Sequence, residues 1–212
     1  MLSRVRSRED GFLLVELLAA MAILGIFFAM FAEFASMLTT RTDAISRNTY
    51  LSAIGRAGTD RFTNELESAM CNGATPPITQ ATATSIQFTT PDRQLPYHLL
   101  QVTYSLSGST FSRQVATSTN TSTTGPPWTM GATSVAIPVI TSVQNGGAAV
   151  FNYFDASGAA ISAPVSAANL PTIARVTATV TIVPQAGRGT GSLTVQGSAT
   201  VRTWMTQELC PS

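Results

Sequence analysis

The stretch FLLVELLAAMAILGIFFAMFA, residues 12 to 32, contains a single ionisable side chain, that of Glu16. A helix of this length rises about 31 Å at about 1.5 Å per residue, which matches the ~30 Å hydrocarbon thickness of a bilayer. The sequence therefore predicts one transmembrane helix, over residues 12–35. Three arginines, Arg4, Arg6 and Arg8, precede the stretch, so the positive-inside rule places the N-terminus in the cytoplasm and the rest of the chain outside.

The composition excludes a disordered chain and a nucleic-acid reader. The chain has 212 residues, of which 44% are hydrophobic and only 11% are charged, and its formal net charge is +1. All twelve basic residues are arginine, but this small net charge offers no basic surface for neutralising phosphates. We therefore expect no direct nucleic-acid partner.

Two residues at the start of the apolar run are unusual for a secretory signal. Gly11 stands immediately before the run and Glu16 lies inside it, while the only small-residue cleavage pattern, Ala20-Met21-Ala22, is buried in the run itself. A carboxylate in an apolar span costs a few kcal/mol at the bilayer centre, which favours a functional role with a partner. The alternative is an interfacial Glu16 that reaches water.

The sequence REDGFLLVELL, from Arg8 to Leu18, resembles the class III leader of type IV prepilins and type II secretion pseudopilins. The resemblance implies that a prepilin peptidase removes residues 1–11 by cutting between Gly11 and Phe12, and then methylates the new amine of Phe12. Leu13 in place of a small hydroxyl residue, and Glu33 near the end of the span, depart from the commonest pattern. The apolar helix itself would be retained in the mature protein.

The same resemblance implies an assembly role for Glu16. Packing the mature helices side by side would bury the positive Phe12 amine, which a neighbour's Glu16 can neutralise. Such a head-to-tail contact does not close, so its repetition gives an open filament. The expected partners are other pilin or pseudopilin subunits, the inner-membrane assembly platform and membrane lipid. The expected location is the inner membrane before assembly and a cell-surface or periplasmic filament afterwards.

The apolar span is followed by an amphipathic stretch. Leu51, Ile54, Gly58, Phe62, Leu66 and Ala69 share one helical face, with Arg56, Asp60 and Glu67 opposite. The stretch ends at Asn72-Gly73 and Pro76-Pro77, so one long helix is predicted over residues 12–71. The alternative is a separate core helix, divided from the membrane helix by a loop at Thr39–Thr42.

Residues 72–212 are predicted to form an extracytoplasmic, β-rich domain. Alternating apolar residues predict strands at Ser85–Thr89, Leu99–Leu106, Thr110–Ala116, Ser134–Val139, Ala149–Phe154, Ile173–Val183 and Ser192–Trp204. Thr117–Pro127 is expected to be a surface loop. The fold class is therefore α+β, with the long helix packed on an antiparallel β-sheet. The helix end and the strand order resemble minor pilins of the PilW/GspJ-like group, which implies a pilin-like fold.

Cys71 and Cys210 are the only cysteines, one near the predicted helix end and the other close to the C-terminus. Outside the cytoplasm the pair could form a disulfide that ties the C-terminal strand to the helix. Two free buried thiols are the alternative, because spacing alone does not establish proximity.

No arrangement of residues in the sequence predicts catalysis, a metal site or a cofactor. His98 is the only histidine, and beside Tyr97 it is expected at a strand edge. Asp155 could add one carboxylate to a calcium site, which is weak support. We therefore expect a structural subunit, a minor pilin or pseudopilin that helps to initiate or cap a filament, and no enzyme. The alternative is a single-span, membrane-anchored extracytoplasmic receptor or enzyme.

Overall fold

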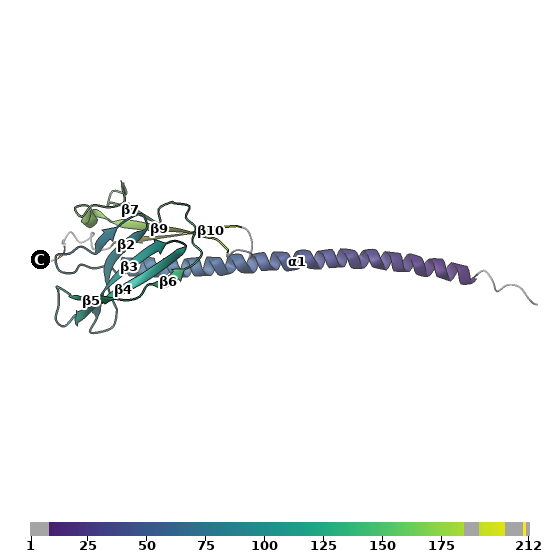
Figure 1. Cartoon of the computed structure of the whole chain (residues 1–212), viewed down its shortest axis with the longest axis horizontal. Helices are drawn as coiled ribbons and strands as arrows, with labels where there is room; N and C mark the ends of the chain where they lie inside the picture. Colours follow the sequence, from purple (N-terminus) through teal and green to yellow (C-terminus); the bar gives the residue numbers. More distant parts are fainter. Residues whose placement is uncertain (1–8, 185–190, 202–209, 211–212) are drawn as a thin grey trace, which may run out of the picture. The chain divides into compact units, whose positions relative to one another are not determined.

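The computed structural model describes residues 9–184, 191–201 and 210. The chain divides into two compact units, Met1–Arg47 and Asn48–Ser212. One helix, α1 (Glu9–Glu67), crosses the boundary between them (Figure 1). The helix thus begins three residues before the expected mature N-terminus, and part of it belongs to each unit.

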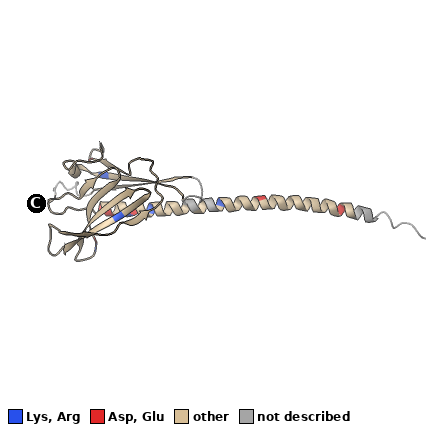
Figure 2. Ribbon diagram, in the orientation of Figure 1, with Lys and Arg blue, Asp and Glu red and all other residues tan. Residues whose placement is uncertain are grey.

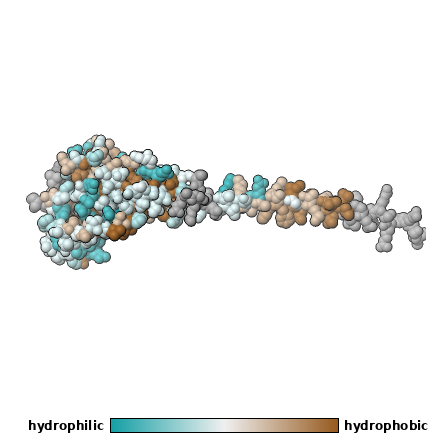
Figure 3. Space-filling view, viewed as in Figure 1, coloured by the Kyte–Doolittle hydropathy of each residue, from teal (hydrophilic) through white to brown (hydrophobic). Residues whose placement is uncertain are grey.

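In the first unit α1 is apolar and exposed. Leu14–Thr42 is long and apolar enough to cross a membrane, and none of it is buried against the rest of the protein. In Figure 3 this part of the helix is mostly brown, or hydrophobic, toward its N-terminal end and carries some pale and teal residues further along, and in Figure 2 only isolated charges lie along it. Leu14–Thr42 is the one such segment among the residues that the structure describes, which agrees with the predicted apolar span.

The predicted alternative of a loop at Thr39–Thr42 is wrong, because α1 is helical throughout this segment. The hydroxyls of Thr39 and Thr40 donate to the carbonyl of Ser36 at 2.9 and 3.1 Å, and that of Thr42 donates to Leu38 at 2.8 Å. A threonine hydroxyl that bonds one turn back satisfies its own polar group without interrupting the helix.

The helix ends at Glu67, four residues before the predicted Cys71. Its last turn tightens, with the amide of Ser68 donating to Glu65 and that of Ala69 to Leu66. The amide of Met70 then donates at 2.9 Å to the carbonyl of Thr89 in a neighbouring strand. Pairing with the sheet therefore replaces the last predicted helical turn.

The β-rich part of the second unit contains two antiparallel sheets. The first has the order β1-β2-β3-β4-β5, with β6 also pairing with β4. Its strands are β1 (Ile78–Ala81), β2 (Ser85–Pro91), β3 (His98–Ser107), β4 (Thr110–Thr121), β5 (Met130–Thr133) and β6 (Ile137–Ile140). The predicted hairpin at Gly108 is confirmed, because Leu106 is opposite Phe111 and Gly108 has a φ of 58°.

The second sheet has the order β10-β9-β7-β8. Its strands are β7 (Phe151–Phe154), β8 (Ala160–Ile161), β9 (Arg175–Ile182) and β10 (Leu193–Thr200), and a short 3-10 helix, η1 (Leu170–Thr172), precedes β9. The predicted antiparallel pairing of the last two long strands is confirmed, with Val176 opposite Ala199. The end of the predicted strand Ser192–Trp204 falls at 202–204, outside the described residues. The α+β class is confirmed.

Phe62 of α1 lies at the centre of the core. Its ring is 5.3 Å from that of Tyr104 in the first sheet and 5.4 Å from that of Phe151 in the second. Leu66, one turn further along α1, is also fully buried. The predicted apolar face of the helix therefore packs against both sheets, and its burial contributes to the stability of the second unit.

Two glycines allow strands to lie directly against α1. A Cβ atom at Gly55 would lie 2.6 Å from a methyl of Val195 in β10, and one at Gly58 would lie 2.8 Å from the side chain of Ile140 in β6. Separations this short force neighbouring atoms to move, so larger residues would push both strands away from the helix.

The predicted surface loop Thr117–Pro127 is partly wrong. Strand β4 continues to Thr121, where it pairs with His98 of β3, and Ser118 pairs with Met130 of β5. The β-branched threonines that look like a low-complexity loop are also good strand formers once both neighbouring strands are present. Of the predicted strand Ser134–Val139, only residues 137–139 are in a strand, β6, and residues 134–136 connect β6 to β5.

Candidate functional site

The predicted processing and assembly residues lie at the start of α1. The backbone of Gly11 and Phe12 is helical, while their side chains fall outside what the structure describes. Glu16 follows Phe12 by four residues, about one helical turn, and is exposed. The structure contains one chain, so the contact between Glu16 and a neighbour's amine stays a prediction.

Cys71 and Cys210 are joined in a disulfide, with their Cα atoms 5.5 Å apart. The bond fixes the end of the chain to the segment that follows α1. Beside it, the side chain of Asn72 makes two hydrogen bonds with the backbone of Trp128. Nδ2 of Asn72 donates to the Trp128 carbonyl at 2.9 Å, and Oδ1 of Asn72 accepts from the Trp128 backbone N–H at 2.7 Å. The predicted disulfide is therefore confirmed, and its surroundings tie the segment that follows α1 to the β4–β5 loop as well.

A charged cluster that the sequence did not predict joins α1 to the first sheet. The Glu65 carboxylate accepts from Nε of Arg113 at 2.9 Å and pairs with its Nη2 at 2.9 Å. It also accepts from the Tyr104 hydroxyl at 2.8 Å and from Nε of Arg61 at 3.2 Å. The two-pronged contact with Arg113 is the geometry in which a guanidinium binds a carboxylate most strongly.

Burial differs strongly within this cluster. The Arg113 side chain is only 10% exposed, whereas that of Arg61 is 54% exposed. Burial raises the pKa of Tyr104 far above its ordinary value, and the charge and hydrogen bond of Glu65 raise it further. Tyr104 is therefore held neutral as a hydrogen-bond donor, and Glu65 is the acceptor that the two buried side chains share.

Alkaline pH should unfold the second unit through its buried tyrosines. Burial also raises the pKa of Tyr153, whose hydroxyl donates to the Thr82 carbonyl at 2.7 Å. In the unfolded chain both phenols ionise near pH 10. The raised pKa of each folded tyrosine therefore contributes fully to the free energy of unfolding below about pH 10. Above that pH the free energy of unfolding falls, by up to about 1.4 kcal/mol per pH unit for each tyrosine. We expect their phenolate absorbance to appear only as β-sheet circular dichroism disappears. Phenolate from these two residues in a protein with an intact β-sheet signal would contradict this expectation, and Tyr104→Phe and Tyr153→Phe identify their contributions.

The sequence contained a signal for the charged cluster. Arg113 lies two residues from Phe111, on the same inward face of β4, and is opposite Tyr104 in β3. The alternation of the strand thus places Arg113 on an apolar, inward face. A buried guanidinium is costly unless an acid pairs with it, so this position predicts a buried acidic partner. The helix position of that acid depends on how α1 crosses the sheet, which the sequence pattern does not determine.

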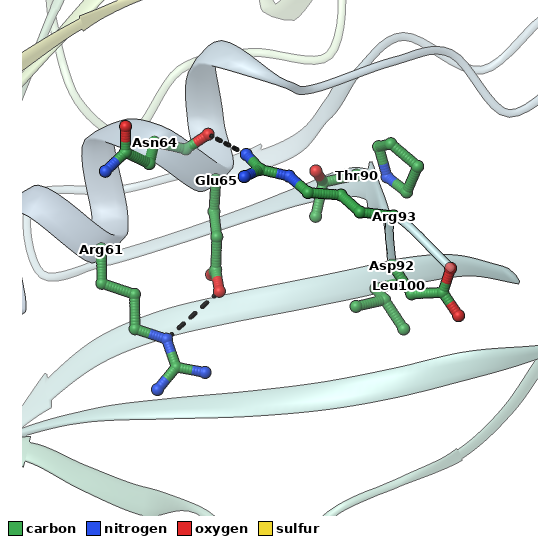
Figure 4. Close-up of a pocket in the computed structure, with 8 residues that line it drawn as sticks. Arg61, Asn64, Glu65, Thr90, Asp92, Arg93 and Leu100 are labelled. Carbon is green, nitrogen blue, oxygen red and sulfur yellow. Dashed lines mark hydrogen bonds and ion pairs between the residues drawn. The ribbon is translucent and has the colours of Figure 1, made fainter. Parts of the chain in front are cut away.

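Two surface depressions flank Arg61. One, of about 300 Å³, is drawn in Figure 4 and is lined by Arg61, Asn64, Glu65, Thr90, Pro91, Asp92, Arg93 and Leu100. Within it, Nη2 of Arg93 donates to the carbonyl of Asn64 at 3.3 Å and to the Ser68 hydroxyl at 2.9 Å. The other, of about 410 Å³, is mostly apolar and is lined by Ile54, Ala57, Gly58, Arg61, Arg113, Ile137, Pro138 and Val139.

The two residues weighed for catalysis and calcium binding have structural contacts. Nδ1 of His98 is 2.9 Å from the Ser118 carbonyl at the start of β3. Asp155 Oδ1 accepts from the hydroxyl of Ser157 at 2.7 Å and from the amides of Ser157 and Ala159, and the Ser157 hydroxyl above all lowers the pKa of this carboxyl. Among the described residues no group of three or more metal-ligating side chains occurs. Asp155 therefore organises the β7–β8 turn.

Comparison with known proteins adds no relative. No protein-family model matches the chain, and no curated protein matches it significantly. The functional argument consequently rests on the residues and their geometry.

Proposed function

We propose that this chain is a minor pilin or pseudopilin, a structural subunit that helps to initiate or cap a type IV pilus-like or type II secretion filament. A prepilin peptidase would first remove residues 1–11. The N-terminus would lie in the cytoplasm, and the β-rich unit would lie outside. The other partners would be neighbouring pilin subunits, the membrane assembly platform and lipid.

The observation that carries this proposal is the continuity of α1. The helix runs without a break from the residues that resemble a prepilin leader, through an exposed apolar span, into the core of the β-rich unit at Phe62 and Leu66. An apolar span that its own chain does not cover must be covered by lipid or by other proteins. A helix that is retained after cleavage can lie in the lipid first and then pack against other subunits.

Glu16 would favour the transfer of the helix from lipid to the filament by pairing with the Phe12 amine of an adjacent subunit. After cleavage Phe12 carries the only N-terminal amine, and moving that charge from the aqueous interface into a helix bundle costs several kcal/mol without a partner. A carboxylate from an adjacent subunit offsets the cost and fixes the relative height of the two helices. The small side chains of Ala19, Ala20 and Ala22, together with Gly25, allow neighbouring helices to approach closely.

Replacing Glu16 by Ala should impair assembly without impairing processing. Membrane insertion and cleavage should continue, because the apolar run and Gly11 are unchanged, but each affected contact should weaken by a few kcal/mol. The measurement is the number of filaments, and the recovery of this chain with its neighbours, in a host that assembles such filaments. Glu33→Ala is the matched control, because it removes the other acid of the exposed apolar segment and should leave assembly normal.

Two outcomes would count against the Glu16 mechanism. If Glu16→Ala protein is processed and supports wild-type filament number and co-purification, the amine needs no partner carboxylate. If Glu33→Ala causes an equal defect, the loss reflects acidity in the span in general.

A further inference from the structure

The second sheet ends in a long edge strand, β10 (Figure 1). It pairs with β9 along its whole length of eight residues without a register shift, and no described strand lies on its other side. It contains no charged residue and no proline. Charges, prolines and bulges are the features by which natural sheets prevent further strands from pairing with an edge. The outer edge of β10 has none of them.

The hydrogen bonds of β9 show which backbone groups of β10 point outward. The amide of Thr179 donates at 2.8 Å to the carbonyl of Val150, on the side of β9 away from β10. The next residue, Val180, therefore directs its backbone groups to β10, where it is opposite Val195. Alternation along β10 then directs outward the amides and carbonyls of Thr194, Gln196, Ser198 and Thr200.

These outward groups are available to another molecule. Thr194, Gln196 and Ser198 are exposed, and the hydrogen bonds found among the described residues leave their backbone groups without a partner. Each residue offers one donor and one acceptor, and the pairs repeat at about 6.8 Å. Another extended polypeptide presents the complementary groups at this spacing, so the chemistry of the edge specifies a β-strand as its occupant.

The side chains of β10 indicate which kind of strand fits. Leu193 and Val195 share the face that packs on α1, where Val195 lies against Gly55, but both are only half-buried. Ala199, further along the same face, is buried. A strand added beside β10 would cover the first two with apolar side chains and would meet uncharged polar ones, such as that of Gln196, on its other face. Its residues should therefore alternate between apolar and uncharged polar.

The other strand edges of this chain do not offer such a strand. Strand β6 contains Pro138, β5 pairs with β4 through a register shift, and β8 has only two residues. In β1 the carbonyl of Ala81 already accepts from the amide of Val165. Among the described strands of a second copy, only another β10 presents a long free edge.

Pairing β10 with β10 is also disfavoured. β10 runs in the same direction as α1, because Val195 lies beside Gly55 and Gly197 lies beside Thr59 and Thr63. With both helices on one face of the joined sheet the two strands are antiparallel, so the helix ends that lead to the apolar spans point in opposite directions. With the helices on opposite faces, the apolar face of one β10 continues into the polar face of the other, which leaves Val195 uncovered.

We propose that β10 is a docking strand for a different polypeptide, which adds an extended segment of alternating apolar and uncharged polar residues to the outer edge of the second sheet. The added strand is antiparallel to β10, as β9 is, and its apolar side chains point toward α1. The contact needs only the second unit. Glu16 and the apolar span take no part in it, so it goes beyond the filament role.

The probe is a labelled peptide with the sequence of β9, RVTATVTI, which has this alternation and is already complementary to β10. Binding to the full chain in detergent micelles is followed by fluorescence anisotropy. On the outer edge, with its valines toward α1, the antiparallel peptide directs the amides of its Thr177 and Thr179 positions to β10. If it replaced β9 on the inner edge, the amides of its Ala178 and Val180 positions would face β10.

N-methylation of the peptide therefore distinguishes the two edges. We expect methylation at the Thr177 and Thr179 positions to weaken binding about tenfold or more, since two hydrogen bonds are lost, and methylation at the Ala178 and Val180 positions to change it less than about twofold. The reverse pattern, or no saturable binding at millimolar peptide, would overturn the proposal. These measurements use wild-type protein and do not depend on the folding of a variant.

Gln196→Pro tests the edge from the side of the protein. It removes an outward amide that β9 does not use, which an edge strand tolerates, so the urea midpoint should change little while peptide binding is lost. Gln196→Thr, which keeps the amide, is the matched control and should bind as wild type does. Self-association of the wild-type chain that Gln196→Pro abolishes would assign the edge to a second copy and overturn the proposal. Binding should be unchanged in Glu16→Ala protein, so failure of this contact and failure of the filament proposal give different results.

Discussion

Replacing Glu65 by Ala is expected to destabilise the second unit by about 3–5 kcal/mol, the usual effect of breaking a buried ion pair. The change leaves the Arg113 guanidinium nine-tenths buried without its carboxylate, and it removes the acceptor of the Tyr104 hydroxyl. The measurement is urea unfolding of the full chain in micelles, followed by tryptophan fluorescence and circular dichroism.

Arg61→Ala is the control for this prediction, because it removes the exposed arm of the same cluster. An exposed ion pair contributes at most about 1 kcal/mol, so this variant should remain close to wild type. Glu65→Leu combined with Arg113→Met should recover much of the lost stability, since no buried charge then remains. Similar losses in Glu65→Ala and Arg61→Ala would mean that burial of Arg113 has little energetic importance.

Removing the disulfide should have the second large effect. The Cys71–Cys210 bond closes a loop with a sequence separation of 139 residues. The loop-entropy model gives a stabilisation of about 5 kcal/mol for a loop of this size, and measured losses on removing native disulfides are about 2–5 kcal/mol. We expect Cys71→Ser combined with Cys210→Ser to lower the urea midpoint by a corresponding amount.

Reducing agent supplies the control for the disulfide. Wild-type protein in reductant should behave as the double variant does, while the double variant itself should not respond to reductant. Two thiols that can be alkylated in the native, unreduced protein would refute the bond, and an unchanged urea midpoint in the double variant would refute its contribution to stability.

The parts of the fold that follow a local period were predictable from the sequence. The buried face at Phe62 and Leu66 follows from a period of 3.6, and the hairpin at Gly108 follows from a period of 2 and a turn residue. The apolar span follows from the length of an almost uncharged stretch. The strands β1, β5 and β8 were missed because they are two to four residues long and show no clear apolar alternation. Their pairing with a neighbouring strand determines them, across a short turn for β1 and β8.

The candidate sites divide in the same way. The cysteine pair could be predicted because the chain has only two cysteines. Gly11, Phe12 and Glu16 were selected because they lie within one short linear pattern, and their roles stay predictions. Glu65 was missed because its role depends on Arg113 and Tyr104, which are about forty or more residues away and meet it only when α1 crosses the sheet. A charge on an apolar strand face predicts a partner, but only the packing of the helix identifies it.

The filament account is tested most directly by the intact mass of this protein after co-expression with an active prepilin peptidase. The account predicts a chain that lacks residues 1–11 and begins with N-methylated Phe12, while Gly11→Leu protein, in which a bulky side chain occupies the cleavage position, should keep its full mass. A control pilin that is processed in the same cells establishes that the peptidase is active. Under those conditions, a wild-type chain that still carries Gly11 would contradict the assignment.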